Sequence, residues 1–211
     1  SMDIVTVLDY LIAFFSLFSV SVFLLLFLKH YLEYGKKLPK PKHIPKISIL
    51  IPAYNEDKYL AVCLKTVLAI DYPKDKFEVL VIDDGSTDNT YSIAKSFECT
   101  NLKVYAKSNS GKGATLNFGI KKAEGELIAT MDADSYPSKK ILWELIPYFN
   151  DPEVMAVTPA VKIRESNSWL KELQRVEYLM ILFSRKLLSF IDSVPVTPGP
   201  FSIFRASVFE K

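Results

Sequence analysis

Two aspartates, Asp132 and Asp134, are separated by one alanine and directly follow the apolar run 127–131. An apolar run of this length predicts a buried strand, and open α/β sheets bind ligands at the carboxyl ends of such strands. Carboxylates at this spacing suit Mg²⁺ or Mn²⁺ bound together with substrate phosphates. The alternative is a solvated aspartate turn that caps a helix starting near Pro137. The aspartate pair alone favours neither interpretation.

Two other polar loops follow expected strands earlier in the chain. Residues 52–56, Pro-Ala-Tyr-Asn-Glu, come after the β-branched run 47–51. Residues 83–86, Asp-Asp-Gly-Ser, come after the apolar run 77–82 and have the composition of a tight turn. Further along, residues 110–113, Ser-Gly-Lys-Gly, open an expected helix. Because the carboxyl ends of parallel strands share one edge of a sheet, we expect these loops to lie close together.

Strand-like and helix-like segments alternate between residues 47 and 158. This alternation predicts an α/β fold, a mainly parallel sheet with helices on both faces. The expected strands lie near 47–51, 77–82, 102–105, 126–131 and 154–158, and the expected helices near 59–68, 89–97, 110–123 and 138–149.

The N-terminal segment is strongly apolar, and residues 10–28 carry no charge. At about 1.5 Å per helical residue this run comes close to the ~30 Å hydrocarbon core of a bilayer. A signal peptide is the competing interpretation. The run is longer than a usual signal-peptide core, no basic segment precedes it and no small-x-small cleavage site follows it. We therefore expect residues 1–28 to contain one retained transmembrane helix.

A basic, proline-containing linker is expected over residues 29–46, between this helix and a domain over residues 47–211. The flank before the helix carries Asp3 and Asp9 and no basic residue, so the positive-inside rule places the domain in the cytoplasm. The linker prolines favour a semi-rigid spacer, and its lysines could contact anionic membrane lipid at about 1 kcal/mol per charge. These lysines are Lys29, Lys36, Lys37, Lys40, Lys42 and Lys46.

The overall composition narrows the function further. Acidic and basic residues nearly balance, with a formal net charge of +2, and this does not indicate a nucleic-acid partner. The two cysteines, Cys63 and Cys99, match no metal or redox motif, which favours free thiols in a reducing compartment.

A second long helix is predicted over residues 169–191. Its apolar residues are interrupted by Arg175, Glu177, Arg185 and Lys186, so it is too broken to span a bilayer. Two interpretations remain open: an amphipathic helix at the membrane interface, or a helix packed in the core of the domain.

The three polar loops, in this order and with Gly111-Lys112-Gly113 and Asn117 between the last two, resemble those of the family 2 glycosyltransferases. The resemblance covers roughly residues 46–211. It implies the GT-A fold, a Rossmann-like α/β domain that binds nucleotide sugars. Within the family, the sequence most resembles the processive group that contains the hyaluronan, chitin and cellulose synthases.

The resemblance assigns the first two loops to the nucleoside. Ala53, Tyr54 and Glu56 would line the nucleoside pocket, with the tyrosine ring or backbone close to the base. Asp84, together with the neighbouring Asp83, would accept a hydrogen bond from the uracil imide.

The third loop and the glycine-lysine segment are assigned to the diphosphate. Lys112 would reach the base or the diphosphate, Asp132 would contact the ribose or diphosphate side of the donor, and Asp134 would ligate a divalent metal, Mg²⁺ or Mn²⁺. The chemistry is consistent, because a cation stabilises the negative charge that builds up on a departing nucleoside diphosphate.

The segment 197–205 resembles the acceptor-side segment of processive members. Gly199 would allow close approach of the sugar or acceptor chain. Arg205 could contact donor or acceptor, or pair on the surface.

The resemblance therefore implies a membrane-anchored, metal-dependent inverting enzyme that transfers sugar from a nucleotide sugar, with UDP expected, to a growing polysaccharide or a lipid-linked acceptor. The family's catalytic base, an aspartate in a Glu-Asp motif, is expected beyond Lys211. General-base help contributes about 10²–10⁴-fold, so we expect a chain truncated before that motif to bind donor but transfer poorly. The alternatives are a polyprenyl-phosphate glycosyltransferase resembling dolichyl-phosphate mannose synthase and a catalytically silent nucleotide-sugar-binding membrane subunit.

Overall fold

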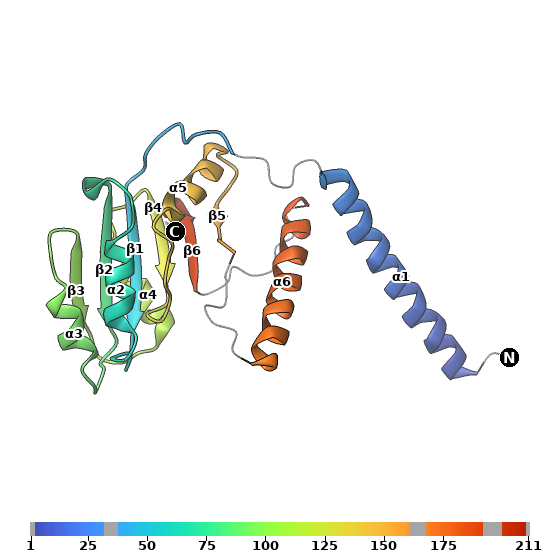
Figure 1. The fold of residues 1–211 in the computed structure, drawn as a ribbon, viewed down its shortest axis with the longest axis horizontal. Coiled ribbons are helices and arrows are strands. Elements are labelled where there is room, and N and C mark those ends of the chain that lie inside the picture. Colours follow the sequence, from blue (N-terminus) through green and yellow to red (C-terminus); the bar gives the residue numbers. More distant parts are fainter. Residues whose placement is uncertain (1–2, 32–37, 161–167, 192–199, 210–211) are drawn as a thin grey trace. The chain divides into compact units, whose positions relative to one another are not determined.

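The fold was analysed in a computed structural model that describes residues 3–31, 38–160, 168–191 and 200–209. The chain separates into two compact units. One contains two long helices, one before the sheet in sequence and one between its last two strands, and the other contains the sheet with its covering helices (Figure 1). Each unit is described by itself below.

Six strands form one mixed sheet in the second unit (Figure 1). They are β1 (Ile47–Ala53), β2 (Phe77–Asp83), β3 (Leu102–Ala106), β4 (Leu127–Met131), β5 (Ala156–Val157) and β6 (Phe201–Arg205). Their order is β3-β2-β1-β4-β6-β5. The first four strands are parallel to one another, whereas β6 is antiparallel to both β4 and β5. The predicted mainly parallel sheet is therefore confirmed.

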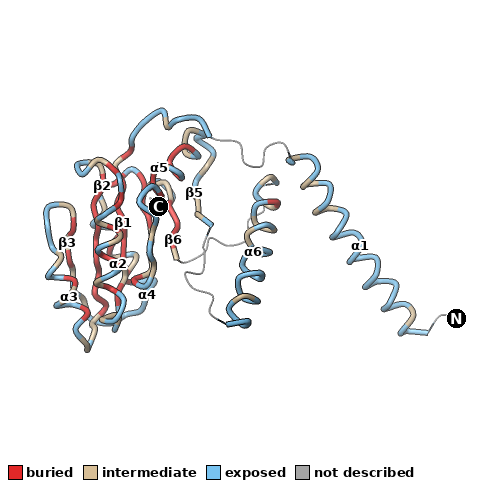
Figure 2. Tube along the Cα trace, in the orientation of Figure 1, coloured by how far each residue is buried: buried red, intermediate tan, exposed pale blue. Residues whose placement is uncertain are grey.

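Helices cover both faces of this sheet. The described helices of the unit are α2 (Leu60–Leu68), α3 (Thr90–Ser96), α4 (Lys112–Ile120) and α5 (Ile141–Leu145), with 3₁₀ turns at Lys74–Lys76, Ile146–Asn150 and Ala206–Phe209. Alternate residues of β1 face opposite sides. Ile49 belongs to the core that α2 covers, and Leu50 to the core that includes Leu116 of α4. Figure 2 shows that the central strands are buried along most of their length. Burial on both faces explains why these strands are apolar at nearly every position.

Two elements differ from the expectation. The helix predicted over 138–149 ends at Leu145 and continues as a 3₁₀ turn, Ile146–Asn150. Pro147 lies in that turn and has no N–H to donate to an α-helical carbonyl, which accounts for the change. The second difference is β6, a strand that the sequence analysis did not predict, which lies between β4 and β5.

Residues 38–46 belong to the sheet unit. The backbone N–H of Lys42 donates to Asn150 Oδ1 at 2.8 Å, and the Tyr72 hydroxyl donates to the Pro45 carbonyl at 2.7 Å. The imidazole of His43 lies 3.0 Å from a carboxylate oxygen of Glu126. This part of the predicted linker is thus attached to the sheet, while residues 32–37 lie outside the described residues.

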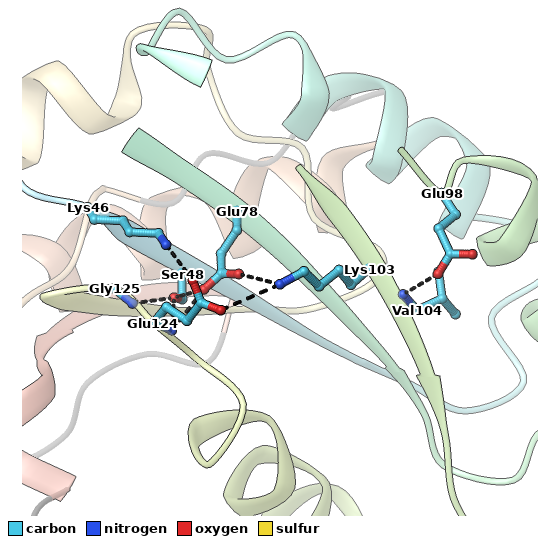
Figure 3. Close-up of polar contacts among 8 residues, drawn as sticks. All are labelled: Lys46, Ser48, Glu78, Glu98, Lys103, Val104, Glu124 and Gly125. Atoms are coloured by element: carbon cyan, nitrogen blue, oxygen red, sulfur yellow. Dashed lines mark hydrogen bonds and ion pairs between the residues drawn. The ribbon is translucent and has the colours of Figure 1, made fainter. Parts of the chain in front are cut away.

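The amino ends of the parallel strands are joined by a buried polar network (Figure 3). The Ser48 hydroxyl donates to Glu78 Oε1 at 2.6 Å and accepts the Gly125 N–H at 2.8 Å. The Glu124 N–H also donates to Glu78 Oε1, at 2.8 Å, and Lys103 Nζ lies 3.6 Å from Glu78 Oε2. A Cβ on Gly125 would lie 2.5 Å from the Ser48 nitrogen, so only glycine fits there. The network fixes the turn before β4 against β1 and β2.

The other unit contains α1 (Ile4–His30) and α6 (Trp169–Ser189). Asp3 caps α1, accepting the Thr6 N–H at 2.8 Å. By length and composition alone α1 could cross a membrane, and none of its residues is buried (Figure 2). The rings of Phe27 on α1 and Phe183 on α6 lie 5.9 Å apart. An apolar cavity of about 500 Å³ also lies between the two helices.

Candidate active site

The loop after β1 is fastened to the loop after β2. Asn55 adopts a left-handed conformation with φ of +55°. Its side-chain oxygen accepts the Thr87 N–H at 2.9 Å, and its own N–H donates to the Ser86 hydroxyl at 3.0 Å. The Glu56 N–H donates to the Thr90 hydroxyl at 2.7 Å. The structure therefore brings together two loops that the sequence analysis predicted to be neighbours.

These loops and the start of α4 enclose a cavity of about 350 Å³. Five of the predicted donor-site residues line it: Ala53, Tyr54, Glu56, Asp84 and Lys112. Pro52, Asn109, Gly111 and Thr115 complete the lining. Asn109 and Thr115 were not singled out from the sequence, where their only signal is proximity to the glycine-lysine segment.

Asp84 lines the cavity, although its carboxylate is nearly buried. Its Oδ1 accepts the Ser110 N–H at 3.0 Å and lies 2.5 Å from Lys107 Nζ, and its Oδ2 accepts the Gly111 N–H at 2.9 Å. Burial acts to raise the pKa of Asp84, but these hydrogen bonds outweigh it and hold the pKa below its usual range. Asp84 is thus ionised at neutral pH and binds the loop before α4.

Asp83, the last residue of β2, is also buried but does not line the cavity. Its Oδ2 accepts the Ser86 N–H at 3.2 Å. Its Oδ1 is buried without a hydrogen-bond partner within the described residues. Such an orphaned acceptor is costly unless something else satisfies it.

Asp132 and Lys112 form an ion pair at 2.5 Å beside the cavity. The backbone of Asp132 forms a turn, since its carbonyl accepts the Ser135 N–H at 3.0 Å. However, α5 begins only at Ile141, with Lys140 at its N-cap and no side-chain capping bond. The alternative in which an aspartate caps that helix is therefore wrong.

Negative charge accumulates around the aspartate pair. The pKa of Glu56 is raised, first by burial and then by the charges of Asp134, Asp132 and Asp88. The pKa of the Cys63 thiol on α2 is also raised, to about 12, first by burial and then by the charges of the two aspartates. The Asp134 side chain is exposed and forms no hydrogen bond or ion pair with other described residues. A cation would relieve this repulsion.

The donor set fits one class of metal ion. Among the described residues no group of three or more side chains could hold a metal by itself. Mg²⁺ is usually bound by one or two carboxylates, and substrate phosphates and water complete its octahedron. Asp134 and Asp132 provide such a partial set, which would require a phosphate-bearing ligand alongside.

The two predicted acceptor-side residues have different outcomes. Gly199 lies outside the described residues, although the carbonyl of its neighbour Pro200 accepts the Asp132 N–H at 3.3 Å. Arg205 pairs with Leu127, at the amino end of β4, whereas Phe201 pairs with Met131 next to the aspartates. Four residues of strand, about 13 Å, therefore separate Arg205 from the aspartate end.

The guanidinium of Arg205 is engaged with the chain itself. It donates to the carbonyls of Phe149, Asp151 and Val154 at 2.8–2.9 Å, and it lies over the Phe149 ring. This position favours the structural interpretation of Arg205 over a contact with donor or acceptor.

Residues 48–211 match the sequence model of Glycosyl transferase family 2. The chain is 33% identical over 146 residues to the probable glycosyltransferase YdaM of Bacillus subtilis. The matched region covers 64% of this chain and 35% of that protein. It is 32% identical over 179 residues to a poly-beta-1,6-N-acetyl-D-glucosamine synthase of Staphylococcus epidermidis, covering 82% of this chain and 43% of that protein. The chain thus spans less than half the length of these relatives.

Two solved structures share the fold. A mannosyltransferase of Pyrobaculum calidifontis, PcManGT, in complex with GDP-Man and Mn²⁺, superposes with a TM-score of 0.70 at 26% identity, covering 90% of this chain and 54% of that one. TarS 1-349 of Staphylococcus aureus in complex with UDP-GlcNAc gives a TM-score of 0.57 at 27% identity, covering 78% and 46%. The expected GT-A fold is confirmed, and the chain belongs to the family 2 glycosyltransferases.

Proposed function

We propose that this chain is the donor-binding part of a membrane-anchored, metal-dependent inverting glycosyltransferase that uses a UDP-sugar. The observation that carries the proposal is the cavity at the carboxyl edge of the sheet, bordered by the ion pair of Lys112 and Asp132. Its volume of about 350 Å³ falls within the usual size of small-molecule sites. A solved neighbour that holds UDP-GlcNAc supports a uridine donor.

In this proposal the nucleoside occupies the cavity. Tyr54 is about half exposed, so its ring is available to a base, and Ala53 and Glu56 also line the cavity. The Asp84 carboxylate also lines the cavity, where it would accept a hydrogen bond from the uracil imide in addition to those it accepts from Ser110 and Gly111. The neighbouring Asp83 has one buried oxygen that finds no hydrogen-bond partner in the described part of the chain.

The diphosphate would lie between α4 and the aspartates. Lys112, the first residue of α4, would leave Asp132 and turn its ammonium toward the phosphates, where the positive end of the helix dipole also favours an anion. Asp134 and Asp132 would hold a divalent cation, as the Mn²⁺ in the PcManGT complex suggests. When bound, that cation would supply charge neutralisation for the departing nucleoside diphosphate.

The reaction would be a single displacement. An acceptor hydroxyl would attack the anomeric carbon from the face opposite the diphosphate, which inverts that centre. The segment that enters β6 supports an acceptor-side position, because the Pro200 carbonyl accepts the Asp132 N–H. The similarity to a polysaccharide synthase favours a growing polysaccharide over a lipid-linked acceptor.

Membrane attachment would come from the helical unit. We propose that α1 crosses the bilayer and that the lysines after it keep the sheet unit in the cytoplasm. Apart from Leu187, the described residues of α6 are not buried, and its apolar residues include Trp169 and Met180, which are strongly exposed. Its ring contact with α1 supports a position at the lipid interface.

Calorimetric titration of the full chain in detergent with UDP, with and without Mn²⁺, tests the proposal. Mn²⁺ should tighten UDP binding at least about tenfold, and Asp134→Ala should remove that gain, since two carboxylates anchor the ion. Asp75→Ala is the matched control, an exposed aspartate next to the start of β2. The assignment of Asp134 as a metal ligand would be contradicted if Mn²⁺ did not change the affinity for UDP, or if Asp134→Ala kept the increase in affinity that Mn²⁺ gives.

A further inference from the structure

Lys107 is a nearly buried lysine that does not line the cavity. It directly follows β3, and its N–H continues the ladder by donating to the Asp83 carbonyl at 3.0 Å. Its ammonium lies 2.5 Å from Asp84 Oδ1, in a pair whose side chains are only 18% and 6% exposed. It also donates to the Ser108 carbonyl at 2.8 Å and to the Ser110 hydroxyl. The ammonium thus has partners on its own loop and on the residue that follows β2, and the Thr115 hydroxyl of α4 lies 3.5 Å away.

The Asp84 carboxylate completes this arrangement from the other side. Its two oxygens accept the N–H groups of Ser110 and Gly111 at 3.0 and 2.9 Å. Gly111 has a φ of +86° and is the N-cap of α4, so these bonds set where the helix and Lys112 begin. The hydroxyl of the fully buried Thr115 in turn donates to the Gly111 carbonyl at 3.0 Å.

The loop 107–111 sits tightly on the end of β2. A Cβ on Gly85 would lie 2.9 Å from the Asn109 nitrogen, so the turn after Asp84 and this loop are in direct backbone contact. Asn109, Gly111 and Lys112 all line the cavity, as does Asp84 itself. One wall of the cavity is therefore held by bonds that converge on Lys107 and Asp84.

We propose that Lys107 is a positioning residue for nucleotide binding, which neutralises the Asp84 carboxylate and holds the loop 107–111 as a wall of the cavity. This inference rests on the proposed function, and it adds a residue that does not touch the nucleotide. Removing the ammonium leaves an uncompensated buried carboxylate. The carboxylate must then take up a proton or draw in water, and either change weakens its hydrogen bonds to the Ser110 and Gly111 N–H groups.

The expected effect is a loss of affinity. Groups that orient metal ligands from behind typically contribute about 10–100-fold in affinity, and we expect the lower end of that range here. Lys107→Met should weaken UDP binding about tenfold, measured below the midpoint of thermal unfolding. A lysine with a purely structural role would lower that midpoint and leave the dissociation constant of the folded protein unchanged.

Lys103→Met provides the matched control. Lys103 lies four residues earlier on β3, pairs with Glu78 at the opposite edge of the sheet, and is drawn in Figure 3. UDP titrations of the full chain in detergent compare wild type with both variants.

If Lys107→Met does not fold, Ser110→Ala serves as a second variant. It keeps the ion pair but removes one acceptor of Lys107, and it should weaken UDP binding about threefold, or roughly 0.6 kcal/mol.

The possible results separate the two proposals. Weaker binding by Lys107→Met, with Lys103→Met at the wild-type value, supports the positioning role. Wild-type affinity in Lys107→Met, or in Ser110→Ala when the first variant is unfolded, overturns that role and leaves the proposed function standing. A wild-type chain that binds no UDP overturns the proposed function itself.

Discussion

The two ends of β2 carry similar groups that are used differently. At the amino end, the nearly buried Glu78 carboxylate accepts hydrogen bonds from Ser48 and the Glu124 N–H, with Lys103 of β3 nearby. Just past the carboxyl end, the nearly buried Asp84 carboxylate accepts backbone N–H groups, with Lys107 beside it. Each end thus has a carboxylate that joins strands to a loop, and a lysine that compensates its charge.

The difference lies in which charge remains unsatisfied: among the described residues, the buried atom without a hydrogen-bond partner is the neutral Asn101 Nδ2 at the amino end, but a carboxylate oxygen of Asp83 at the carboxyl end. At the amino end, Glu78 and Ser48 satisfy each other and the turn before β4. At the carboxyl end, Asp84 and Glu56 line a cavity of about 350 Å³, the charge of Asp134 raises the pKa of Glu56, and Asp83 has an oxygen without a hydrogen-bond partner among the described residues. The comparison teaches that a buried carboxylate–lysine pair by itself indicates stability, and that only the unsatisfied charge beside one indicates a ligand.

Removing the amino-end carboxylate should have the largest effect, and only on stability. Glu78→Ala leaves the Ser48 hydroxyl and the Glu124 N–H without their acceptor, at a cost of about 3 kcal/mol in the free energy of unfolding. Thermal unfolding in detergent measures this loss. The UDP dissociation constant of the folded variant should stay at the wild-type value, and weaker binding would show that the two ends are not independent.

Removing the exposed lysine of the carboxyl end should have the opposite pattern. The Lys112 side chain is 58% exposed, and exposed ion pairs contribute little to stability, so Lys112→Met should leave the unfolding midpoint nearly unchanged. Its UDP affinity should fall about tenfold, or about 1.4 kcal/mol, through loss of a charged phosphate contact. Lys121→Met, just past the other end of α4, is the control. Equal affinities in the two variants would count against a phosphate contact by Lys112.

The smallest effect concerns the carboxylates at the cavity. A pKa of Glu56 above its unfolded value means that the folded state binds the proton more tightly, so stability rises as pH falls through the folded pKa. At neutral pH the ionised carboxylate is destabilising. Glu56→Gln should therefore raise stability at pH 7, by about 0.5 kcal/mol or less, and the gain should vanish below about pH 4. Unfolding curves at both pH values measure it, and a loss of stability at pH 7 would contradict the repulsion.

The sequence was sufficient to predict much of the sheet and its loops. Strands β1, β2 and β4 are apolar on both faces because helices cover both, and that pattern is local. The polar loops follow at the carboxyl edge by the geometry of parallel strands. Five of the residues predicted from these loops line one cavity.

The missed features depend on contacts between distant parts of the chain. Nothing local in Phe201–Arg205 indicates that this strand pairs antiparallel with β4, where Phe204 pairs with Ile128, 76 residues earlier in the chain. That pairing puts Arg205 beside Leu127, at the end of β4 opposite the aspartates. Likewise, the sequence cannot show that Lys107 faces Asp84, since the two are joined only through the β2–β3 pairing.

Hydrogen exchange of the full chain in detergent, with and without UDP and Mn²⁺, tests the central claim most directly. The claim is that the nucleotide binds at the carboxyl edge and leaves the amino edge untouched. We predict slower exchange in peptides that cover residues 52–57 and 107–116, and no change in those that cover 46–49 and 123–127. Protection at the amino edge, or none at the carboxyl edge when UDP is bound, would contradict the account.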